Sequence, residues 1–351
     1  MEIVVYGAGA IGGYLGGRLA LAGHAVTLVA RPAAAESLNA NGLTITQDGQ
    51  TQIAPVRAVG RLAEAFDGPP PRLIVLGMKA YDLAAAVAEL AVVCPRPAML
   101  LTTQNGIGVE EIVAAPFGAE RVLAGSITIP IRRSGPTGVA VERAGRGMGV
   151  APLLPERSVA DWVALFAAAG IRAGGLPDYR AMKWSKVFLN VMGNATSAIL
   201  NRPPAELYRN DAIFDLEMRM LGEILAVMKR LGLPIVNLPA ASVRPLAATR
   251  AYAPRFLRRL VFTQVVAHGR GDKMPSFHID LAAGKGHSEV VFHNGAVAAA
   301  GRACGVATPV NATLNDVLLR LTRDEAARAD FDGRSERLLA EVERMERGGF
   351  T

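Results

Sequence analysis

A glycine-rich segment between two apolar runs constrains this 351-residue chain more than any other feature. The run Ile3-Val4-Val5 has the composition of a buried strand, and glycines at positions 7, 9 and 12 follow it as G-x-G-x-x-G. An apolar pattern at helical spacing comes next, and residues 25–29 are typical of a second buried strand. A strand, a glycine turn, a helix and a strand in this order predict the unit that binds a dinucleotide in doubly wound α/β folds.

Each glycine of that turn has a physical task. Gly7 allows a tight turn, Gly9 lets the backbone approach a pyrophosphate, and Gly12 lets the helix pack closely on the strand. The helix N-terminus adds unpaired N–H groups and a positive dipole end. A glycine-rich turn with a purely structural role is the alternative. The residues expected to bind the cofactor phosphates are Gly7, Ala8, Gly9, Ala10, Ile11 and Gly12. Three further glycines are interpreted as close packing against the sheet or the cofactor: Gly13, Gly16 and Gly17.

The residue after the second strand indicates which dinucleotide is bound. Folds that prefer NAD usually place Asp or Glu there, to accept a hydrogen bond from the ribose 2′-hydroxyl. This chain has no carboxylate between Glu2 and Glu36, and it carries Arg31 at that place. A guanidinium suits a 2′-phosphate in both charge and geometry. The sequence therefore favours NADPH/NADP+, with Arg31 as an ordinary solvated loop cation being the alternative.

Length and composition set the broad class. A chain of 351 residues with 51% hydrophobic content predicts two domains with sizeable cores. The first strand follows Met1 directly and no apolar run reaches about 18 residues, so we expect neither a signal peptide nor a membrane span. Cys94 and Cys304 have no metal-like or redox spacing, which fits the reduced cytoplasm. The net charge of +7 comes from scattered Lys and Arg without a nucleic-acid motif, and suits an anionic cofactor and substrate.

Polar side chains follow two further predicted strands. Lys79 comes soon after the apolar run at 73–76, and Asn105 soon after the run at 98–103. Because the carboxyl ends of parallel strands border the ligand crevice, both are candidate site residues. The alternatives are a solvated lysine and a common Asn-Gly turn. Short runs between 121 and 155 predict more strands that complete this first domain.

From Asp178 onward the pattern is helical, with helices expected at about 179–200, 211–231, 244–268, 287–303 and 310–322. The first of these carries Lys186, Asn190 and Asn194 at spacing i, i+4, i+8, which places them on one face of a continuous helix. The rest of its circumference is largely apolar, so these polar groups need partners, as a ligand crevice would supply. A narrow solvated stripe is the alternative.

A second polar cluster lies between 275 and 294. Ser276 has a hydroxyl that can donate to a carboxylate, and Glu289 precedes an apolar run, where a helix N-terminus also prefers an acid. Three histidines occur here, but their spacing matches no helical pair of ligands, so no metal site is expected. These histidines are His278, His287 and His293.

Taken together, these motifs resemble the ketopantoate reductase (2-dehydropantoate 2-reductase) family over roughly residues 1–323. Beside the glycine turn and Ala30-Arg31, the resemblance rests on several ordered segments. These are Lys79-Ala80, Gln104-Asn105-Gly106-Ile107-Gly108, Trp184-x-Lys186-x3-Asn190-x3-Asn194, Pro275-Ser276-x3-Asp280, Ser288-Glu289-Val290, Asn294-Gly295 and the closing run from Cys304 to Leu314. The resemblance implies hydride transfer from NADPH to the C2 ketone of a 2-oxo acid.

The resemblance also implies residue roles. Lys186 matches the general acid and Glu289 its acidic partner. Asn105 would contact both nicotinamide ribose and substrate, and Lys79 would lie beside the cofactor. Asn190, Asn194 and Ser276 would hold the substrate. The implied architecture is an α/β Rossmann-type domain at 1–176 and an all-α catalytic domain at 177–323. Residues 324–351 extend beyond the usual end of the family, and their pattern predicts an amphipathic helix that packs on the body or on a second subunit.

Ala195, Arg202-Pro203-Pro204 and a longer interval from Asp280 to Glu289 depart from the family pattern, all on the substrate side. The leading prediction is therefore a cytoplasmic NADPH-dependent reductase of ketopantoate that serves pantothenate and coenzyme A synthesis. The same chemistry on another branched or aromatic 2-oxo acid is the first alternative. A non-catalytic NADPH-binding redox sensor is the second. The expected partner is a small 2-oxo acid, with no nucleic acid and no membrane, and a homodimer stays open.

Overall fold

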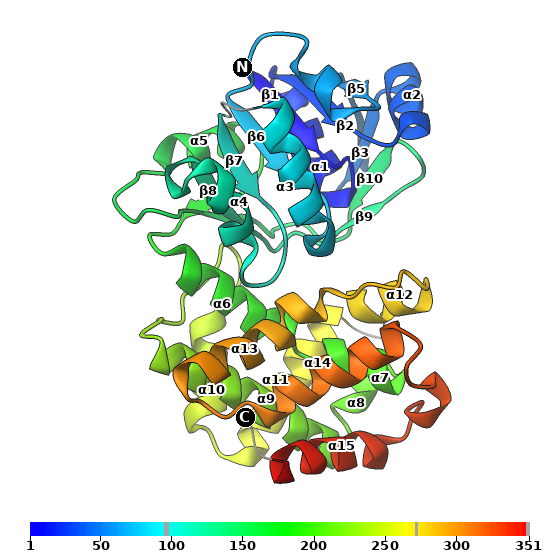
Figure 1. Ribbon diagram of the computed structural model, residues 1–351, viewed down its shortest axis with the longest axis vertical. Helices are drawn as coiled ribbons and strands as arrows, with labels where there is room; N and C mark the ends of the chain where they lie inside the picture. Colours follow the sequence, from blue (N-terminus) through cyan, green and yellow to red (C-terminus); the bar gives the residue numbers. More distant parts are fainter. Residues whose placement is uncertain (95–97, 271–272, 349–351) are drawn as a thin grey trace. The chain divides into compact units, whose positions relative to one another are not determined.

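The computed structural model of the protein describes residues 1–94, 98–270 and 273–348 (Figure 1). The chain divides into two compact units. The first, here called the sheet unit, comprises Met1–Gln104, Gly108–Met182 and Leu238–Ala241. The second, here called the helical unit, comprises Asn105–Ile107, Lys183–Asn237 and the chain from Ser242 onward.

The sheet unit is built on an eight-stranded sheet. Its strands are β1 (Glu2–Tyr6), β2 (Ala25–Val29), β5 (Arg57–Val59), β6 (Leu73–Leu76), β7 (Met99–Thr102), β8 (Val122–Ile127), β11 (Met148–Pro152) and β12 (Ala173–Gly175). Their order is β12-β11-β8-β7-β6-β1-β2-β5. Neighbouring strands are parallel except for the antiparallel pair β8 and β11. The order reverses direction between β1 and β6, which is the topological switch point where such sheets bind ligands.

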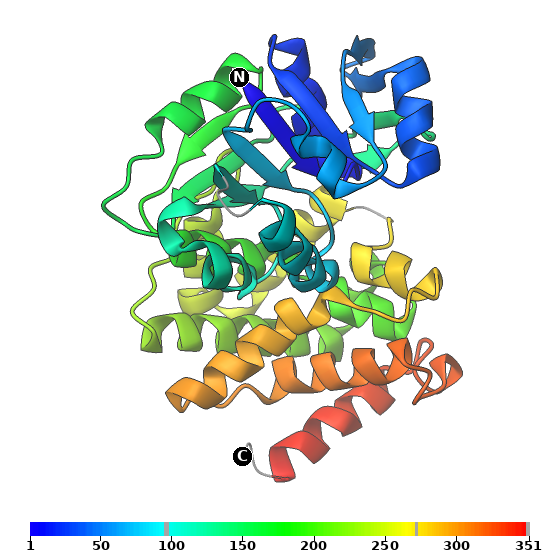
Figure 2. The same cartoon turned by 45° about the horizontal axis from the view of Figure 1, so that its top comes forward.

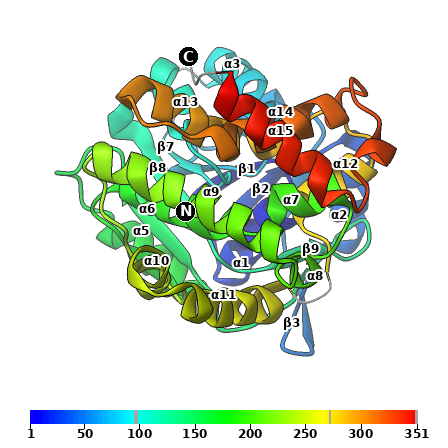
Figure 3. The same cartoon turned by 90° about the horizontal axis from the view of Figure 1, so that it is seen from below.

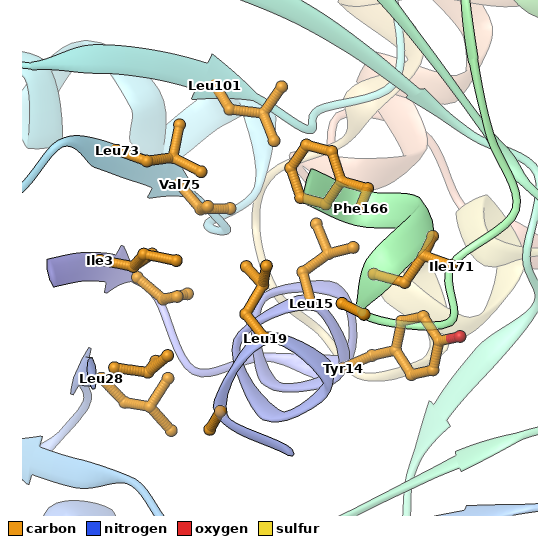
Figure 4. Close-up of a cluster of buried hydrophobic side chains, with 14 of the residues drawn as sticks. Ile3, Tyr14, Leu15, Leu19, Leu28, Leu73, Val75, Leu101, Phe166 and Ile171 are labelled. Carbon is orange, nitrogen blue, oxygen red and sulfur yellow. The ribbon is translucent and has the colours of Figure 1, made fainter. Parts of the chain in front are cut away.

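Helices cover this sheet because its central strands are apolar on both faces. Leu15 and Leu19 of α1 (Ala10–Leu21) and Phe166 of α5 (Ala160–Ala168) meet the strand side chains on one face, as Figure 4 shows. The opposite face is covered by α3 (Leu83–Val93) and α4 (Val109–Phe117), which bury Leu83, Leu90 and Val113. The expected Rossmann-type fold class is thus confirmed for this part of the chain.

A smaller, four-stranded sheet lies against α1. It has the order β4-β3-β10-β9 and consists of β3 (Leu43–Gln47), β4 (Gln50–Ala54), β9 (Ile131–Arg133) and β10 (Gly138–Val141). The glycines of α1 fit between the two sheets. A Cβ on Gly16 would lie 2.9 Å from Leu28 in the large sheet, and a Cβ on Gly17 would lie 2.6 Å from Ile45 in the small one. Both approaches are closer than ordinary van der Waals contact, so the interpretation of these glycines as close packing is confirmed for the sheets.

The helical unit contains the all-α part of the predicted fold class, which is likewise confirmed. It consists of the end of α6 (Tyr179–Asn190), α7 (Asn194–Leu200), α8 (Pro204–Leu207), α9 (Asp211–Arg230), α10 (Val243–Tyr252), α11 (Arg255–Arg270), α12 (Ser276–Ala282), the 3₁₀ turn η4 (Glu289–Phe292), α13 (Asn294–Cys304), α14 (Pro309–Thr322) and α15 (Ser335–Arg347). Figures 2 and 3 both show α15 lying alongside α14. Because α15 buries Leu338 and Val342 there, the extension packs on the body of its own chain.

Three helix predictions were wrong in part, because two of the predicted helices are interrupted and the third begins with a 3₁₀ turn. The helix expected over 179–200 is interrupted after Asn190, and Gly193 adopts a φ of +62° before α7 begins. The helix expected over 244–268 is two helices, because Ala253 is extended before Pro254. The segment 287–303 begins with η4 rather than with α13. Among the described residues, no helix is both long and apolar enough to cross a membrane.

Candidate active site

The glycine turn of the sheet unit has the shape expected of a phosphate site. Gly7 has a φ of +102°, and a Cβ there would lie 2.8 Å from the backbone nitrogen of Met78. A Cβ on Gly12 would lie 2.1 Å from the Gly7 oxygen. A Cβ on Gly9 would meet its nearest protein atom at 3.7 Å, an ordinary distance. Packing of the protein therefore requires glycine at positions 7 and 12, whereas at position 9 it leaves room for an external group.

The first turn of α1 is open to an anion. Gly9 is the N-cap, no side chain caps the helix, and the first turn carries no acidic residue. The N–H groups of this turn and the positive end of the helix dipole are therefore available to a phosphate. Ala8, Ala10 and Ile11 contribute backbone to the same turn. The residues present fit the pyrophosphate of a dinucleotide.

Arg31 and Lys79 follow the carboxyl ends of two strands of the sheet unit. Arg31 comes two residues after β2, is the N-cap of α2 (Pro32–Asn41), and exposes its side chain. The first turn of α2 has no acidic residue, so this strand end lacks the carboxylate that would accept from a ribose 2′-hydroxyl. Lys79 follows β6 and is half-buried. These placements fit a cationic site for a phosphorylated ribose.

Gln104 links the carboxyl end of β7 to that of β6, a role that the sequence did not reveal. Its amide donates to the carbonyl oxygens of Leu76 at 2.9 Å and Met78 at 3.1 Å. The hydroxyl of Thr103 donates to the same Leu76 oxygen at 2.7 Å. Gln104 is only 4% exposed. Its position in the motif therefore has a structural reason, because it fixes the loop that carries Lys79.

The segment Asn105–Ile107 belongs to the helical unit, although β7 precedes it in the sequence. The amide of Asn190, at the end of α6, donates to Asn105 Oδ1 at 3.1 Å. The backbone N–H of Ile107 donates to the carbonyl oxygen of Phe292 in η4 at 2.8 Å. The segment that carries Asn105 is thus held by α6, which ends at the candidate Asn190, and by η4, which begins at the candidate Glu289.

Asn194 and Ser276 are brought together at the start of α12. Asn194 is 3% exposed, donates to the Asn190 carbonyl oxygen at 3.3 Å and accepts from the backbone N–H of Phe277 at 3.2 Å. Ser276 is the first residue of α12 and is exposed. The common helical face expected for Asn194 is replaced by this contact across the break between α6 and α7. The amide still joins α6 to the turn that carries Ser276.

A buried histidine, His293, is bonded to the backbone of Glu289, and its pKa is affected by the charge of Lys186. His293 is 2% exposed, donates from Nδ1 to the Glu289 carbonyl oxygen at 3.0 Å, and packs edge-on against Phe277 with ring centroids 5.2 Å apart. Burial lowers the pKa of His293, and the nearby cations Lys183 and Lys186 lower it further, against an opposing effect of Glu289. The ring is therefore neutral at pH 7. Glu289 itself is 4% exposed and Lys186 half-buried.

The helical unit contains six predicted site residues, which are Asn105, Lys186, Asn190, Asn194, Ser276 and Glu289. Hydrogen bonds link Asn105 to Asn190, Asn194 to the Asn190 carbonyl oxygen, and Asn194 to the backbone of Phe277, the residue after Ser276. An ammonium group, amide groups, a hydroxyl and a carboxylate together can bind a polar, anionic molecule and transfer a proton to it. Within the described part of the chain, no three His, Cys, Asp or Glu side chains are grouped as a metal site requires.

Comparisons with known proteins match this arrangement. The family model described as "Ketopantoate reductase PanE/ApbA" covers residues 3–149, and the model of its C-terminal part covers residues 178–321. A 2-dehydropantoate 2-reductase of Mesorhizobium japonicum is 31% identical over 257 residues, which are 66% of this chain and 77% of that protein.

Solved structures give the same result. A PanE/ApbA family ketopantoate reductase from Ralstonia eutropha aligns with a TM-score of 0.77 and 26% identity, covering 93% of this chain and 99% of that one. D-mandelate dehydrogenase with NADH and anilino(oxo)acetate aligns with a TM-score of 0.77 and 20% identity, covering 92% of this chain and 99% of that one, and this likeness shows the fold alone. Because the two family models together span most of its length, the chain belongs to the ketopantoate reductase family, a family of oxidoreductases.

Proposed function

We propose that this protein reduces 2-dehydropantoate (ketopantoate) to pantoate with NADPH, and so serves pantothenate and coenzyme A synthesis in the cytoplasm. The observation that carries the proposal is the hydrogen-bonded series from Asn105 through Asn190 and Asn194 to the start of α12, in the same unit as Lys186 and the buried Glu289. The family membership supports the reaction class. Under this proposal residues 1–176 bind the cofactor, residues 177–323 carry the substrate site, and residues 324–351 are a structural extension.

NADPH is proposed as the cofactor on the chemistry of the strand ends. The open N-terminus of α1 would hold the pyrophosphate, and Arg31 would bind the 2′-phosphate, with Lys79 close to the cofactor. The absence of acidic residues from the first turns of α1 and α2 supports an anionic ligand at both places. When bound, the reduced nicotinamide supplies the hydride that reaches the C2 carbon of the substrate.

Lys186 is proposed as the general acid. As hydride reaches the carbonyl carbon, negative charge develops on the carbonyl oxygen, and an adjacent ammonium stabilises that charge before it donates its proton. The products are the 2-hydroxy acid, NADP+ and a neutral lysine, which regains a proton from the solvent. Glu289 is buried in the same unit, and under this proposal its carboxylate would pair with the ammonium group in a partly water-excluded place. Glu289 would therefore orient Lys186 and help keep it charged.

Asn190, Asn194 and Ser276 are proposed to hold the substrate. Their amides and hydroxyl can donate to a carboxylate and accept from a hydroxyl group. Asn194 is fixed on both sides by backbone groups of α6 and α12, which pre-organises it at little entropic cost on binding. Asn105, held by Asn190, would contact both the nicotinamide ribose and the substrate.

The decisive experiment follows the loss of NADPH absorbance after ketopantoate is added. We expect rapid oxidation, and Lys186→Ala should lower kcat by at least about 100-fold because general acid catalysis is lost. Lys229→Ala is the matched control, since Lys229 is an exposed lysine near the end of α9 in the same unit. NADPH binding should be the same in all three proteins. Normal turnover by Lys186→Ala would remove this residue from the mechanism.

The same assay separates the alternatives. Ala195 and Pro203-Pro204 depart from the family pattern on the substrate side, and this favours a second candidate, reduction of a different branched or aromatic 2-oxo acid. Lysine-dependent turnover of such an acid, without turnover of ketopantoate, would support it. Tight NADPH binding without turnover of any 2-oxo acid would support the redox-sensor alternative. Light scattering on the purified protein would test the open expectation of a homodimer.

A further inference from the structure

Arg133, which the sequence did not single out, lies at the glycine turn. It is the last residue of β9 in the small sheet, and its Nη1 donates to the carbonyl oxygen of Ala8 at 2.6 Å. Its Nη2 donates to the carbonyl oxygens of Gly135, at 3.4 Å, and Pro136. A guanidinium group from a segment more than 120 residues away is thus placed on the middle of G-x-G.

The glycines of α1 explain why this arginine reaches the turn. A Cβ on Gly13 would lie 3.2 Å from Val139, and a Cβ on Gly17 would lie 2.8 Å from Leu43. The small sheet can therefore pack directly on α1. Val139 pairs with Arg133 in the register of β10 and β9, so the contact at Gly13 sets the position of Arg133 along the helix. The G-x-G-x-x-G-G pattern thus serves the second sheet as well as the first.

Among the described residues, no carboxylate is paired with the guanidinium group of Arg133. Its neighbour Arg132, in contrast, lies 3.9 Å from Glu142. The first turn of α1 adds the positive end of a helix dipole and no acidic side chain. Two positive features next to each other favour a bound anion.

The hydrogen bonds of Arg133 also pre-organise it. Arginine has five N–H donors, and the three bonds to carbonyl oxygens leave donors for a further acceptor. A long side chain that is already held in place loses less entropy when a ligand arrives. Arg133 can therefore contact a phosphate at a lower entropic cost than a freely moving arginine.

We propose that Arg133 is a cofactor-binding residue that contacts the pyrophosphate of the dinucleotide from the small sheet. This inference rests on the proposed use of NADPH by the sheet unit. Because NADPH and NADH share the pyrophosphate, the contribution of Arg133 is the same for both. Arg31, in contrast, is proposed to bind the 2′-phosphate that only NADPH carries, so its contribution is specific to NADPH.

The test measures the Kd values of NADPH and NADH by fluorescence titration at several salt concentrations. Arg133→Ala and Arg133→Gln are compared with Arg132→Ala, a matched control on the same strand. Gln at position 133 keeps amide N–H donors but carries no charge. We expect both Arg133 variants to raise both Kd values about tenfold, to leave the ratio of the two unchanged, and to flatten the salt dependence. Arg132→Ala should bind both cofactors as the unaltered protein does.

Other outcomes would overturn the inference. Normal binding by Arg133→Gln together with weak binding by Arg133→Ala would make Arg133 only a clamp on the turn. A change confined to NADPH would move Arg133 to the 2′-phosphate. If the unaltered protein binds neither NADPH nor NADH, the proposed function itself fails. If the unaltered protein binds both and the Arg133 variants bind them equally well, only the proposed role of Arg133 fails.

Discussion

Gly106 is the residue whose backbone most directly fixes a candidate site group. Its φ is +103°, a conformation that side chains rarely adopt, and a Cβ there would lie 2.6 Å from both Cβ and the carbonyl oxygen of Phe292. The next residue, Ile107, donates to that same oxygen at 2.8 Å. Asn105 therefore depends on a glycine at position 106 for its hydrogen bond with Asn190.

Gly106→Ala is expected to lower kcat/KM at least tenfold, because the added Cβ pushes the segment 105–107 away from η4 and displaces Asn105. Gly284→Ala is the matched control. Gly284 also has a positive φ, +60°, but a Cβ there meets nothing within 4 Å. Steady-state kinetics on both variants check the prediction. Equal and small effects of the two substitutions would show that the close approach to Phe292 is unimportant.

Single residues also show which parts of the candidate site could be predicted from the sequence and which could not. Lys186, Glu289 and the asparagines were named from motifs, and the structure gathers them in one unit. From the sequence, His293 was considered only as a metal ligand. Its actual contacts are the Phe277 ring and the Glu289 carbonyl oxygen, and the ring contact depends on tertiary packing that the sequence pattern does not show. Arg133 was missed for a similar reason, because its partner Ala8 is far away in sequence.

At the scale of elements, the break between α6 and α7 is held by a buried carboxylate. Glu217 of α9 is fully buried and accepts from the N–H of Gly193 at 3.0 Å, the hydroxyl of Thr196 at 2.6 Å and the hydroxyl of Tyr208 at 2.8 Å. These bonds hold the N-cap residue Gly193 and the first turn of α7 to α9. The break, and with it the position of Asn194, therefore depends on a residue of another helix.

Glu217→Gln should destabilise the helical unit by about 1–3 kcal/mol, because an amide leaves at least one of these buried donors without an acceptor. It should also raise KM for the 2-oxo acid through displacement of Asn194. The measurement is urea unfolding followed by Trp184 fluorescence in a Trp162→Phe background, so that the signal comes from the helical unit. Glu343→Gln, an exposed site on α15, is the control. Identical unfolding of the two variants would contradict the role of Glu217.

The same break shows how far periodicity predicts elements. Strands β1, β2, β6 and β7 and helices α9 and α14 lie where their apolar patterns indicated. The apolar pattern of residues 179–200 continues across Gly193, although the helix is interrupted there. Such a pattern shows which residues are buried and does not show the tertiary hydrogen bonds that interrupt the helix. The expected helix over 244–268 ran through Pro254, although proline disfavours helical conformation in the residue before it. The hairpin of β3 and β4 was not predicted either, although its turn is Asp48-Gly49, with both φ values positive.

At the scale of the whole molecule, two buried groups give the folding stability opposite responses to pH. Burial raises the pKa of Glu223 to about 7, although its carboxylate accepts from the N–H groups of Val310 and Asn311 at 2.9 Å each. Its stabilising contribution is therefore complete below its ordinary pKa and is lost as pH rises through about 7. His293 has a lowered pKa, so the unfolded chain binds its proton more tightly. Its contribution is complete above its ordinary pKa and is lost as pH falls below that value.

The net charge of +7 complicates a simple reading of the pH profile, because acidification adds positive charge and self-repulsion to the whole chain. Single substitutions isolate each group, with the free energy of unfolding measured in urea from pH 5 to pH 8 in the Trp162→Phe background. Relative to the parent protein, His293→Gln should gain stability as pH falls, and Glu223→Gln should gain stability as pH rises. His268→Gln, which replaces an exposed histidine on α11, is the control for the loss of an imidazole ring. A His293→Gln curve parallel to that of the parent would mean that His293 binds its proton equally well in the folded and the unfolded chain. Below its ordinary pKa the ring would then be a third cation near Lys183 and Lys186, which contradicts a histidine kept neutral by burial.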